Sequence, residues 1–242
     1  MGRLIAVTSG KGGAGKSSVS VHLATALAKL SERVLIVDLD AGMRCLDIML
    51  GVSDRLLFDL SDVLDKNKSV QEAVISLGNL DFLPAPLKGK INPTEFSRFI
   101  SEVLEDYDFI ILDFPAGTVD ELYTALPRYC EALVVCNADA VSLRDAAIMG
   151  ADLSELNFMS VRLILNRVSF KNMQKGITAN IDEVIDTSGI RLMGVVPQSM
   201  DIYMSCCSGQ PLGKRTRAAK AFERIAKRVM GYDIPLMPYK KI

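Results

Sequence analysis

The chain has 242 residues, 49% of them hydrophobic and 24% charged, with a formal net charge of −1. This composition is typical of a water-soluble globular protein. The near-zero charge excludes attraction of the whole molecule to nucleic acid or anionic membrane, so such binding needs a local patch. Five irregularly spaced cysteines do not indicate a disulfide framework, and no apolar run approaches the ~20 residues of a membrane span. Since the first residues lead into a predicted strand without a signal peptide, we expect a cytoplasmic protein.

Short apolar runs alternate with amphipathic stretches along the chain. We predict helices over 16–29, 94–105, 119–126, 141–156, 181–188 and about 215–230. Strands are predicted in the runs RLIAVT, RVLIVDL, LDFLPA, FIILDF, ALVVCNA, VRLILNR and RLMGVVP. Nearly continuous apolar strands separated by helices indicate an α/β fold, a mostly parallel twisted sheet with helices on both faces. No repeat or linker divides the chain, so we expect one domain over 1–242, with 231–242 as an irregular tail.

A glycine-rich segment, GKGGAGKS at residues 10–17, lies between the first predicted strand and helix. It fits the phosphate-binding template G-x-x-x-x-G-K-[ST] in its required strand–loop–helix setting. The glycines let backbone N–H groups turn toward phosphate oxygens, and the helix N-terminus adds positive potential. Lys16 is predicted to reach the β- and γ-phosphates and Ser17 to bind Mg²⁺. The predicted nucleotide contacts of this loop are Gly10, Lys11, Gly12, Gly13, Ala14, Gly15, Lys16, Ser17 and Ser18.

Three aspartates lie at or just after predicted strand ends. Asp38 ends RVLIVD, Asp40 follows it, and Asp113 ends FIILD. In P-loop proteins a strand-end carboxylate holds the metal, usually through water, and ligands bind at this edge of the sheet. A single aspartate there is also typical of a turn. Three of them together with a P-loop predict a metal and water site.

Beyond the general template, KGGAGKS resembles the deviant Walker A motif, KGGxGK[ST], of the MinD/ParA family of P-loop ATPases. The stretch VDLDAGMRCLDIMLG (37–51) resembles switch I of the MinD branch, and DFPAG (113–117) resembles its switch II. VSLRDA and GVVPQ...GQPL also have MinD-like counterparts, so the similarity runs from residue 3 to about 231. The resemblance implies a P-loop ATPase that uses ATP, ADP and Mg²⁺ and forms a homodimer when ATP is bound.

The resemblance also implies roles for individual residues. In the family the early lysine, here Lys11, contacts the phosphates bound by the opposite subunit, which would make transition-state stabilisation available only in the dimer. Asp40 would position or activate the attacking water. The implied catalytic set is Lys11, Lys16 and Asp40, and the implied metal set is Ser17, Asp40 and Asp113, the last acting through water. The implied adenine contacts are Asn166, Arg167, Pro197 and Gln198, while Asp145 resembles a family aspartate near the dimer surface.

Several cysteines depart from the MinD pattern or have no role in it. Cys45 stands where MinD proteins usually carry asparagine, which puts the kinetics of the switch in question more than nucleotide binding. Cys206 and Cys207 are adjacent, whereas iron–sulfur carriers of this class use cysteines spaced by two residues at a dimer interface. Adjacent thiols do not easily chelate one cluster. We interpret the remaining candidates as packing residues: His22, Cys130 and Cys136.

The C-terminal end departs further. MinD proteins end in an amphipathic segment that inserts into membrane, but GYDIPLMPYKKI is too short and proline-broken for such a helix. The basic stretch 214–230 carries an apolar stripe of Ala218, Phe222, Ile225 and Val229. A basic amphipathic helix can lie on an anionic bilayer or follow DNA phosphates. The stripe is no wider than a core helix needs, so we favour packing on the sheet, with the charged face still open to DNA or lipid.

The favoured function is a MinD-like spatial regulator of division-site placement, an ATP-dependent dimerisation switch with slow hydrolysis stimulated by an activator or effector protein. Two alternatives stay open: a ParA-like ATPase that positions DNA, cargo or flagella, and an iron–sulfur carrier ATPase. A non-hydrolysing ATP sensor is a further alternative. We expect a cytoplasmic location, with peripheral attachment to the inner face of the cell membrane left open.

Overall fold

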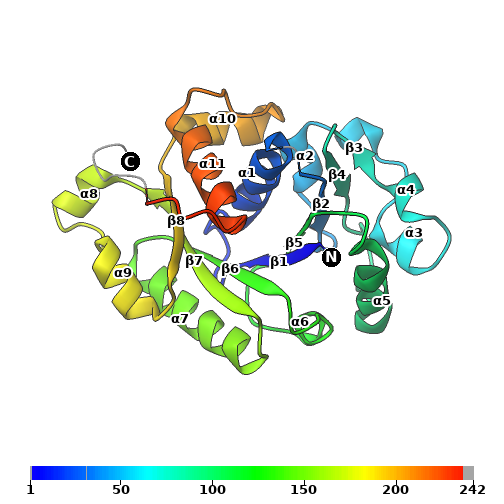
Figure 1. Cartoon of the computed structure of the whole chain (residues 1–242), viewed down its shortest axis with the longest axis horizontal. Coiled ribbons are helices and arrows are strands. Elements are labelled where there is room, and N and C mark those ends of the chain that lie inside the picture. Colours follow the sequence, from blue (N-terminus) through cyan, green and yellow to red (C-terminus); the bar gives the residue numbers. More distant parts are fainter. Residues whose placement is uncertain (1, 31, 237–242) are drawn as a thin grey trace.

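A computed structural model describes residues 2–30 and 32–236, which form a twisted sheet covered by helices (Figure 1). The strand order is β3-β4-β2-β5-β1-β6-β7-β8, and among the described residues neighbouring strands are parallel except for the antiparallel pair β3–β4. The strands are β1 (Arg3–Thr8), β2 (Val34–Asp38), β3 (Ile75–Ser76), β4 (Leu80–Leu83), β5 (Phe109–Asp113), β6 (Glu131–Cys136), β7 (Ser160–Val168) and β8 (Leu192–Pro197). All seven predicted strands are therefore confirmed. The two-residue strand β3 is additional, and it is too short to give an alternating pattern.

Helices of very different length connect the strands, and the last two, α10 and α11, follow β8. They are α1 (Lys16–Lys29), α2 (Leu46–Leu50), α3 (Leu60–Leu64), α4 (Val70–Ala73), α5 (Pro93–Val103), α6 (Glu121–Thr124), α7 (Ala140–Glu155), α8 (Phe170–Gln174), α9 (Ile181–Ser188), α10 (Met200–Ser208) and α11 (Arg217–Val229), with a 3₁₀ turn at Ser53–Arg55. The helix predicted over 119–126 is shorter than expected. It begins only after Asp120, whose carboxylate accepts the backbone N–H of Leu122 at 3.0 Å, and it ends before Pro127.

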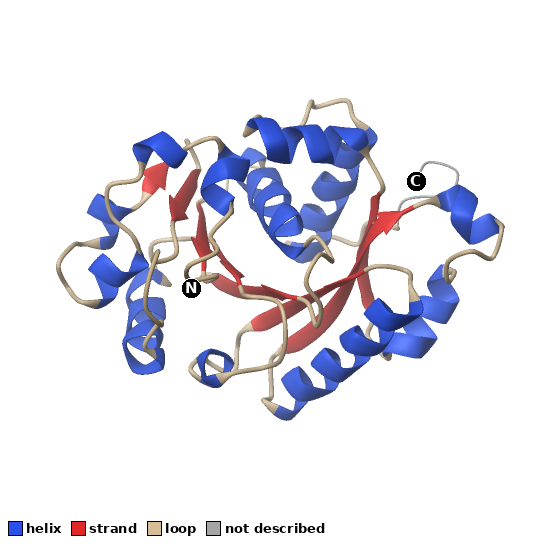
Figure 2. Cartoon of the chain, turned by 180° about the vertical axis from the view of Figure 1, so that it is seen from behind, coloured by secondary structure: helices blue, strands red, loops and turns tan. Residues whose placement is uncertain are grey.

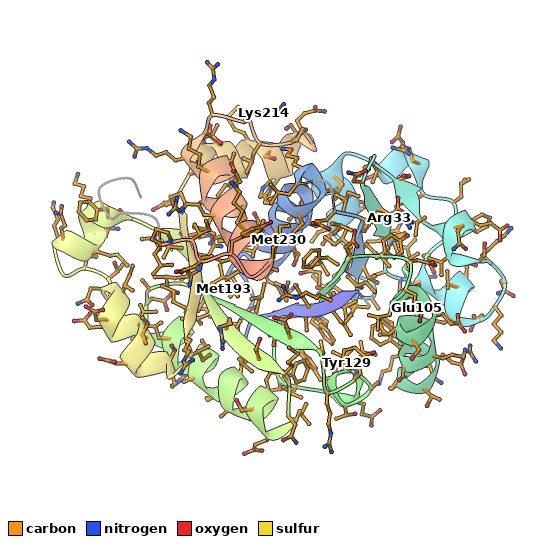
Figure 3. The ribbon with its side chains drawn as sticks, in the orientation of Figure 1. Arg33, Glu105, Tyr129, Met193, Lys214 and Met230 are labelled. Carbon is orange, nitrogen blue, oxygen red and sulfur yellow. The ribbon has the colours of Figure 1, made fainter. Side chains whose placement is uncertain are left out.

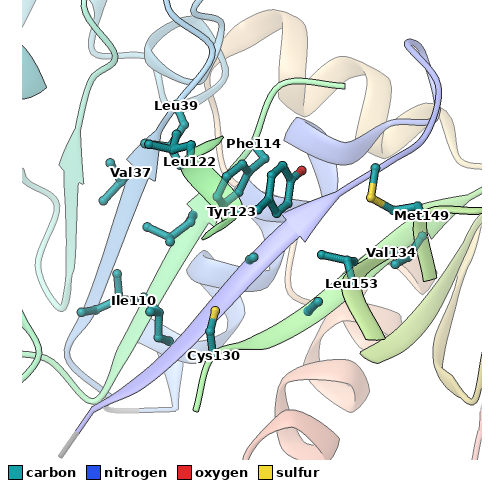
Figure 4. Packing of buried hydrophobic residues seen from close by; sticks show 14 of the residues in the cluster. Val37, Leu39, Ile110, Phe114, Leu122, Tyr123, Cys130, Val134, Met149 and Leu153 are labelled. Carbon is teal, nitrogen blue, oxygen red and sulfur yellow. The ribbon is translucent and has the colours of Figure 1, made fainter. Parts of the chain in front are cut away.

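The two faces of the sheet carry separate apolar cores. Along β1, Ile5 and Val7 belong to a core shared with α1 and α11, whereas Leu4 and Ala6 face the core under α5, α7 and α9. Figure 2 shows these helix layers on either side of the sheet. Figure 4 shows the second core, in which the rings of Phe114 and Tyr123 stack at 4.0 Å between centroids. Helices on both faces confirm the predicted α/β architecture.

Helix α11 packs on the sheet as favoured. Its stripe of Ala218, Phe222, Ile225 and Val229 is at most 2% exposed, which leaves no apolar face of this helix for a membrane. The helix begins at Arg217, so Lys214 and Arg215 lie in the preceding loop, and Figure 3 labels Lys214 at the upper edge of the view. In the part of the chain that is described, no helix is both long and apolar enough to span a bilayer.

The segment after α11 folds back along it. The Arg224 and Arg228 guanidinium groups donate to the carbonyl oxygens of Pro235 and Ile234, and Arg228 also reaches the carbonyl of Leu192 in β8. Residues 231–236 form neither helix nor strand, as expected for the tail. The rest of the predicted tail, 237–242, lies outside the described residues.

Candidate functional site

A cavity of about 680 Å³ opens at the carboxyl ends of the parallel strands. Its walls come from the loop after β1, the loops after β2 and β5, and the ends of β7 and β8, which is where α/β sheets bind ligands. Twelve of the predicted site residues line it: Gly12, Gly13, Ala14, Gly15, Lys16, Ser17, Ser18, Asp40, Asn166, Arg167, Pro197 and Gln198. Asp113 lies buried beneath the loop, while Gly10 and Lys11 do not line the cavity.

The conformation of the phosphate-binding loop requires glycine at Gly15. This residue has φ 91° and directly precedes α1, and a Cβ here would lie 2.2 Å from the Asn166 side-chain nitrogen. Asn166 uses that nitrogen to donate a hydrogen bond to the Ala14 carbonyl oxygen at 2.9 Å. Strand β7 therefore holds the loop in place through Asn166.

A buried ion pair lies beneath the loop. The Lys16 ammonium is 3.2 Å from the Asp113 carboxylate, and the Ser20 hydroxyl donates to the same carboxylate oxygen at 2.7 Å. Lys16 also donates to the Ser17 hydroxyl at 3.2 Å. The side chains of Lys16 and Asp113 are 6% and 0% exposed. The ammonium therefore balances a carboxylate that would otherwise be an isolated buried charge.

The second oxygen of Asp113 is buried and has no hydrogen-bond partner among the described residues. A buried carboxylate oxygen that stays unpartnered is unfavourable, so such an atom indicates a missing water or ion. Hard oxygen donors, here the Asp113 carboxylate, the Asp40 carboxylate and the Ser17 hydroxyl, are the ligands that Mg²⁺ prefers. The residues present therefore fit a hydrated magnesium ion.

Asp38, the third strand-end aspartate, serves the backbone instead. Its carboxylate accepts N–H groups from Asp40 at 2.9 Å, Cys45 at 3.3 Å and Leu46 at 3.5 Å. Burial, with a smaller contribution from the charge of Asp113, raises the pKa of Asp38 to about 6. Asp38 thus fixes the turn that presents Asp40 to the cavity. Burial also raises the pKa of Asp40, against the opposing effect of the Lys16 charge.

Lys11 lies outside the cavity of its own chain. Its side chain is exposed, its carbonyl oxygen accepts the Ser9 hydroxyl at 3.0 Å, and it forms no ion pair within the described residues. The neighbouring Gly10 packs on α7, where a Cβ would lie 2.6 Å from the Asp145 carbonyl oxygen. The Asp145 carboxylate pairs with Arg144 at 3.5 Å.

The sequence did not predict one wall of the cavity, which is formed by α10. This wall consists of Ser199, Met200, Ile202, Tyr203 and Cys206. Four residues from other loops and helices also line the cavity and were not predicted: Ser9, Cys45, Met49 and Ala116. Ser199 caps α10 and Gly209 ends it, so these two boundary residues were a usable sign of a helix. Helix α10 lacks the buried apolar stripe by which the other helices were predicted, because its buried residue is Ser205.

Two of the five cysteines line the cavity beside the phosphate-binding loop. Cys45 lines the cavity together with Ser17, and the Cys206 thiol lies 3.3 Å from the Ser18 hydroxyl. Cys130 and Cys136 are fully buried in the core, as is His22, whose ring lies 5.1 Å from that of Phe222, so the packing interpretation is confirmed.

No group of three or more histidine, cysteine or acidic side chains is arranged to hold a metal in residues 2–30 and 32–236.

The comparisons with known proteins agree on one family. A ParA model, described as NUBPL iron-transfer P-loop NTPase, matches residues 1–230. The septum site-determining protein MinD of Bacillus subtilis is 33% identical over 98% of this chain and 92% of that protein. MinD of Thermotoga maritima is 34% identical over 98% of this chain and 91% of its own length.

Solved structures of MinD share the fold. MinD in the MinC:MinD cell division complex of Aquifex aeolicus superposes with a TM-score of 0.90 at 30% identity, covering 98% of this chain and 99% of its own. MinD of Pyrococcus horikoshii, complexed with Mg-ADP, superposes with a TM-score of 0.84 at 28% identity, covering 97% of this chain and 100% of its own. The P-loop, the sequence matches over nearly the whole chain and the similarity to solved MinD structures all indicate the same family. The chain belongs to the MinD/ParA family of P-loop NTPases.

Proposed function

We propose that the chain is a MinD-type ATPase that dimerises when it binds ATP and takes part in placing the division site. One observation carries the proposal. The buried Lys16–Asp113 pair lies beneath the nucleotide cavity, while the second loop lysine, Lys11, is exposed and outside it. One lysine is thus available to the chain's own phosphates and the other to a facing subunit.

Phosphate binding would use the loop backbone and Lys16. An ammonium has three N–H donors. Two of the Lys16 N–H donors contact Asp113 and Ser17, so the third stays available for a phosphate oxygen. When bound, Mg²⁺ would supply positive charge that neutralises the phosphates; Ser17 and Asp40 would hold it, with Asp113 acting through water. The Mg-ADP complex of the Pyrococcus horikoshii relative supports this choice of cofactor.

The base would bind between β7 and β8. Asn166 already donates to the loop, so its side-chain oxygen is the atom left for the adenine amino group. Arg167 adopts φ 53°, an unfavourable conformation for arginine that is typical of functional sites. Pro197 and Gln198, at the end of β8, also line the cavity.

Hydrolysis would be slow in the separate subunit, because the transferred phosphate then lacks the cation of Lys11. In the dimer, Lys11 of each subunit would approach the phosphates of the other and stabilise developing negative charge. Asp40, at the cavity wall, would orient the attacking water. The MinC:MinD complex of Aquifex aeolicus supports an effector protein as a further partner of this chain.

The test is the ATP hydrolysis rate per subunit, measured against protein concentration. For the wild type we expect this rate to rise with concentration as dimers form. Lys11→Ala should keep ATP binding but give a low rate that does not depend on concentration. Lys16→Ala should lose both ATP binding and ATP hydrolysis. Lys171→Ala, on α8, serves as the surface-charge control. A concentration-independent wild-type rate that Lys11→Ala leaves unchanged would refute the proposal.

DNA is a second candidate target, on a separate observation. Lys214, Arg215, Arg217 and Lys220 are exposed and form no ion pair among the described residues, so they present a basic surface at the start of α11. Such a surface favours phosphate contacts that weaken as salt rises. ATP-dependent retention on non-specific duplex at low salt, lost in Lys214→Gln/Arg215→Gln, would support it. Equal elution with and without duplex would exclude it.

A further inference from the structure

A second cavity, of about 380 Å³, lies behind the nucleotide cavity. Helix α1 forms one side of it, and α2, the β3–β4 turn and the α10–α11 connection form the others. Its lining residues are Val21, His22, Thr25, Ala28, Lys29, Met49, Leu50, Leu77, Asn79, Leu80, Ser205, Gly209, Gln210 and Pro211. A further cavity of about 340 Å³, along α11, shares His22, Thr25 and Lys29 with it. These volumes are in the range that encloses small molecules.

A single layer of side chains separates the second cavity from the nucleotide. Met49 lines both cavities. Cys206, in the nucleotide cavity, has its sulfur 3.7 Å from the His22 Nε2 atom, which belongs to the second cavity. A molecule in the second cavity would therefore contact residues that also shape the nucleotide site.

The lining determines the chemistry of an occupant. Half of the second cavity is apolar, from Val21, Ala28, Met49, Leu50, Leu77, Leu80 and Pro211, and no acidic side chain lines it. Lys29 is its one charged residue and forms no ion pair among the described residues. In the adjoining cavity Lys214 adds a second cation, while the carboxylate of Glu223 pairs with Lys227 at 2.6 Å. The available charge is positive, which excludes a cationic ligand.

We propose that the second cavity binds a small amphipathic anion, an apolar body with one carboxylate. The apolar body lies against Met49, Leu50 and Leu80, and the carboxylate pairs with Lys29 where the two cavities meet. Removing apolar surface from water supplies the affinity, and the charge-assisted bond to the ammonium fixes the orientation. Because Met49 and His22 belong to the shared wall, an occupant also changes nucleotide affinity, and by linkage nucleotide changes the affinity for the occupant.

Calorimetric titration of the nucleotide-free full chain with decanoate, below its micelle concentration, tests the site. We expect saturable binding to one site, with decanol, the uncharged analogue, binding about tenfold more weakly, a difference of ~1.4 kcal/mol. Lys29→Met should weaken decanoate about tenfold and leave decanol unchanged. Leu77→Trp and Gln210→Trp, two rim substitutions that fill the cavity, should each block both probes. Lys171→Met, on α8, should bind as the wild type does.

Absence of saturable binding would overturn the inference. So would equal decanoate affinity in the wild type, Lys29→Met and the two tryptophan variants, the result expected of adsorption to exposed apolar side chains. Thermal unfolding confirms that each variant is folded. The coupling to nucleotide rests on the proposed function, but the binding does not. A chain that binds decanoate and not ATP would refute the proposed function alone, and one that binds ATP and not decanoate would refute this site alone.

Discussion

Beneath the phosphate-binding loop, a buried lysine and a buried aspartate form an ion pair within the chain. Lys16 and Asp113 are 3.2 Å apart, and Ser20 completes the hydrogen bonding of one carboxylate oxygen. Breaking one side of such a pair leaves an uncompensated buried charge, which is more unfavourable than removing both partners. The residue that would bind phosphate therefore also stabilises the fold, because it compensates the buried Asp113 charge.

Lys16→Met should consequently lower the free energy of unfolding of the nucleotide-free chain by about 3 kcal/mol. The double variant Lys16→Met/Asp113→Asn should recover most of that loss, because no charge is left buried. Lys11→Met, which removes an exposed ammonium, should change stability by no more than about 0.5 kcal/mol. Urea unfolding of the four proteins is the measurement, and equal stabilities of Lys16→Met and Lys11→Met would contradict the prediction.

His22 makes stability depend on pH. Burial, aided by the charge of Lys29, lowers its pKa from 6.5 to about 4. Between these values the unfolded chain binds the proton more readily than the folded chain. The stability due to neutral His22 is thus fully present above the unfolded pKa and is lost as pH falls toward 4.

From pH 7 to pH 5 this loss amounts to about 2 kcal/mol, at ~1.4 kcal/mol per pKa unit. His22→Phe keeps a ring beside Phe222 and removes the proton site, so its free energy of unfolding should fall less over the same interval. Urea unfolding at the two pH values measures the difference. Parallel curves for both proteins would show that His22 does not carry the effect.

At the scale of elements, α2 and α10 meet through their terminal glycines. Gly51 and Gly209 both adopt left-handed conformations, with φ 67° and 66°, and a Cβ on Gly209 would lie 2.4 Å from the Gly51 Cα atom. Helix α2 brings Met49 to the nucleotide cavity, and α10 brings Tyr203. The backbone contact therefore sets the distance between two walls of that cavity.

Gly209→Ala should separate these helices. Its matched control is Gly189→Ala, because Gly189 has the same φ of 66°, also ends a helix and has nothing within 4 Å of a built Cβ. The control should lose about 1 kcal/mol for the left-handed conformation. Gly209→Ala should lose roughly 1 to 3 kcal/mol more through overpacking and should bind ADP more weakly. Urea unfolding measures the free energy of unfolding of both variants, and titration measures their ADP affinity. Identical stabilities and identical ADP affinities in the two variants would exclude a separation of the helices.

Elements with a strong hydrophobic pattern, whether continuous or periodic, were predictable from the sequence. Elements held by helix caps and packing contacts were not. The seven predicted strands are nearly continuous apolar runs that the sheet buries, and α5, α7, α9 and α11 each bury a stripe at helical spacing; sequence patterns report both properties. Helix α10 was missed because its exposed residues Met200, Tyr203 and Met204 reverse the usual pattern. Glycine and lysine spacing alone located the phosphate loop. The part played by Asp38 depends on backbone contacts to Asp40 and Leu46, which no residue pattern encodes.

Across the whole molecule, the basic residues of α11 differ in what they contact: Lys227 pairs with Glu223 at 2.6 Å, and the other four form two contrasting pairs. Arg224 and Arg228 are engaged with backbone carbonyls of the returning segment, whereas Arg217 and Lys220 are exposed. The first pair secures residues 231–236 against α11 and β8. The second pair contributes charge to the surface without any such role.

Arg224→Gln/Arg228→Gln should therefore speed amide hydrogen exchange at Tyr232 and Ile234, whose N–H groups bond to Lys227 and Tyr232. Arg217→Gln/Lys220→Gln changes the net charge equally and should leave exchange at these amides as in the wild type. Exchange measured by NMR separates the two groups. Equal acceleration in both double variants would trace the effect to charge and not to the carbonyl contacts.

The strand order has a consequence for the making of the protein. Strand β1 lies between β5 and β6, pairing Ile5 with Ile111 and Glu131, so during synthesis β1 has no partner until residues 109–136 are made. At about 5–20 residues per second, an apolar strand stays unpaired for several seconds. Asn166, which holds the phosphate loop, emerges later still. An unpaired apolar strand is exposed to aggregation during this interval, and nucleotide cannot stabilise the nascent chain until Asn166 is available to hold the loop.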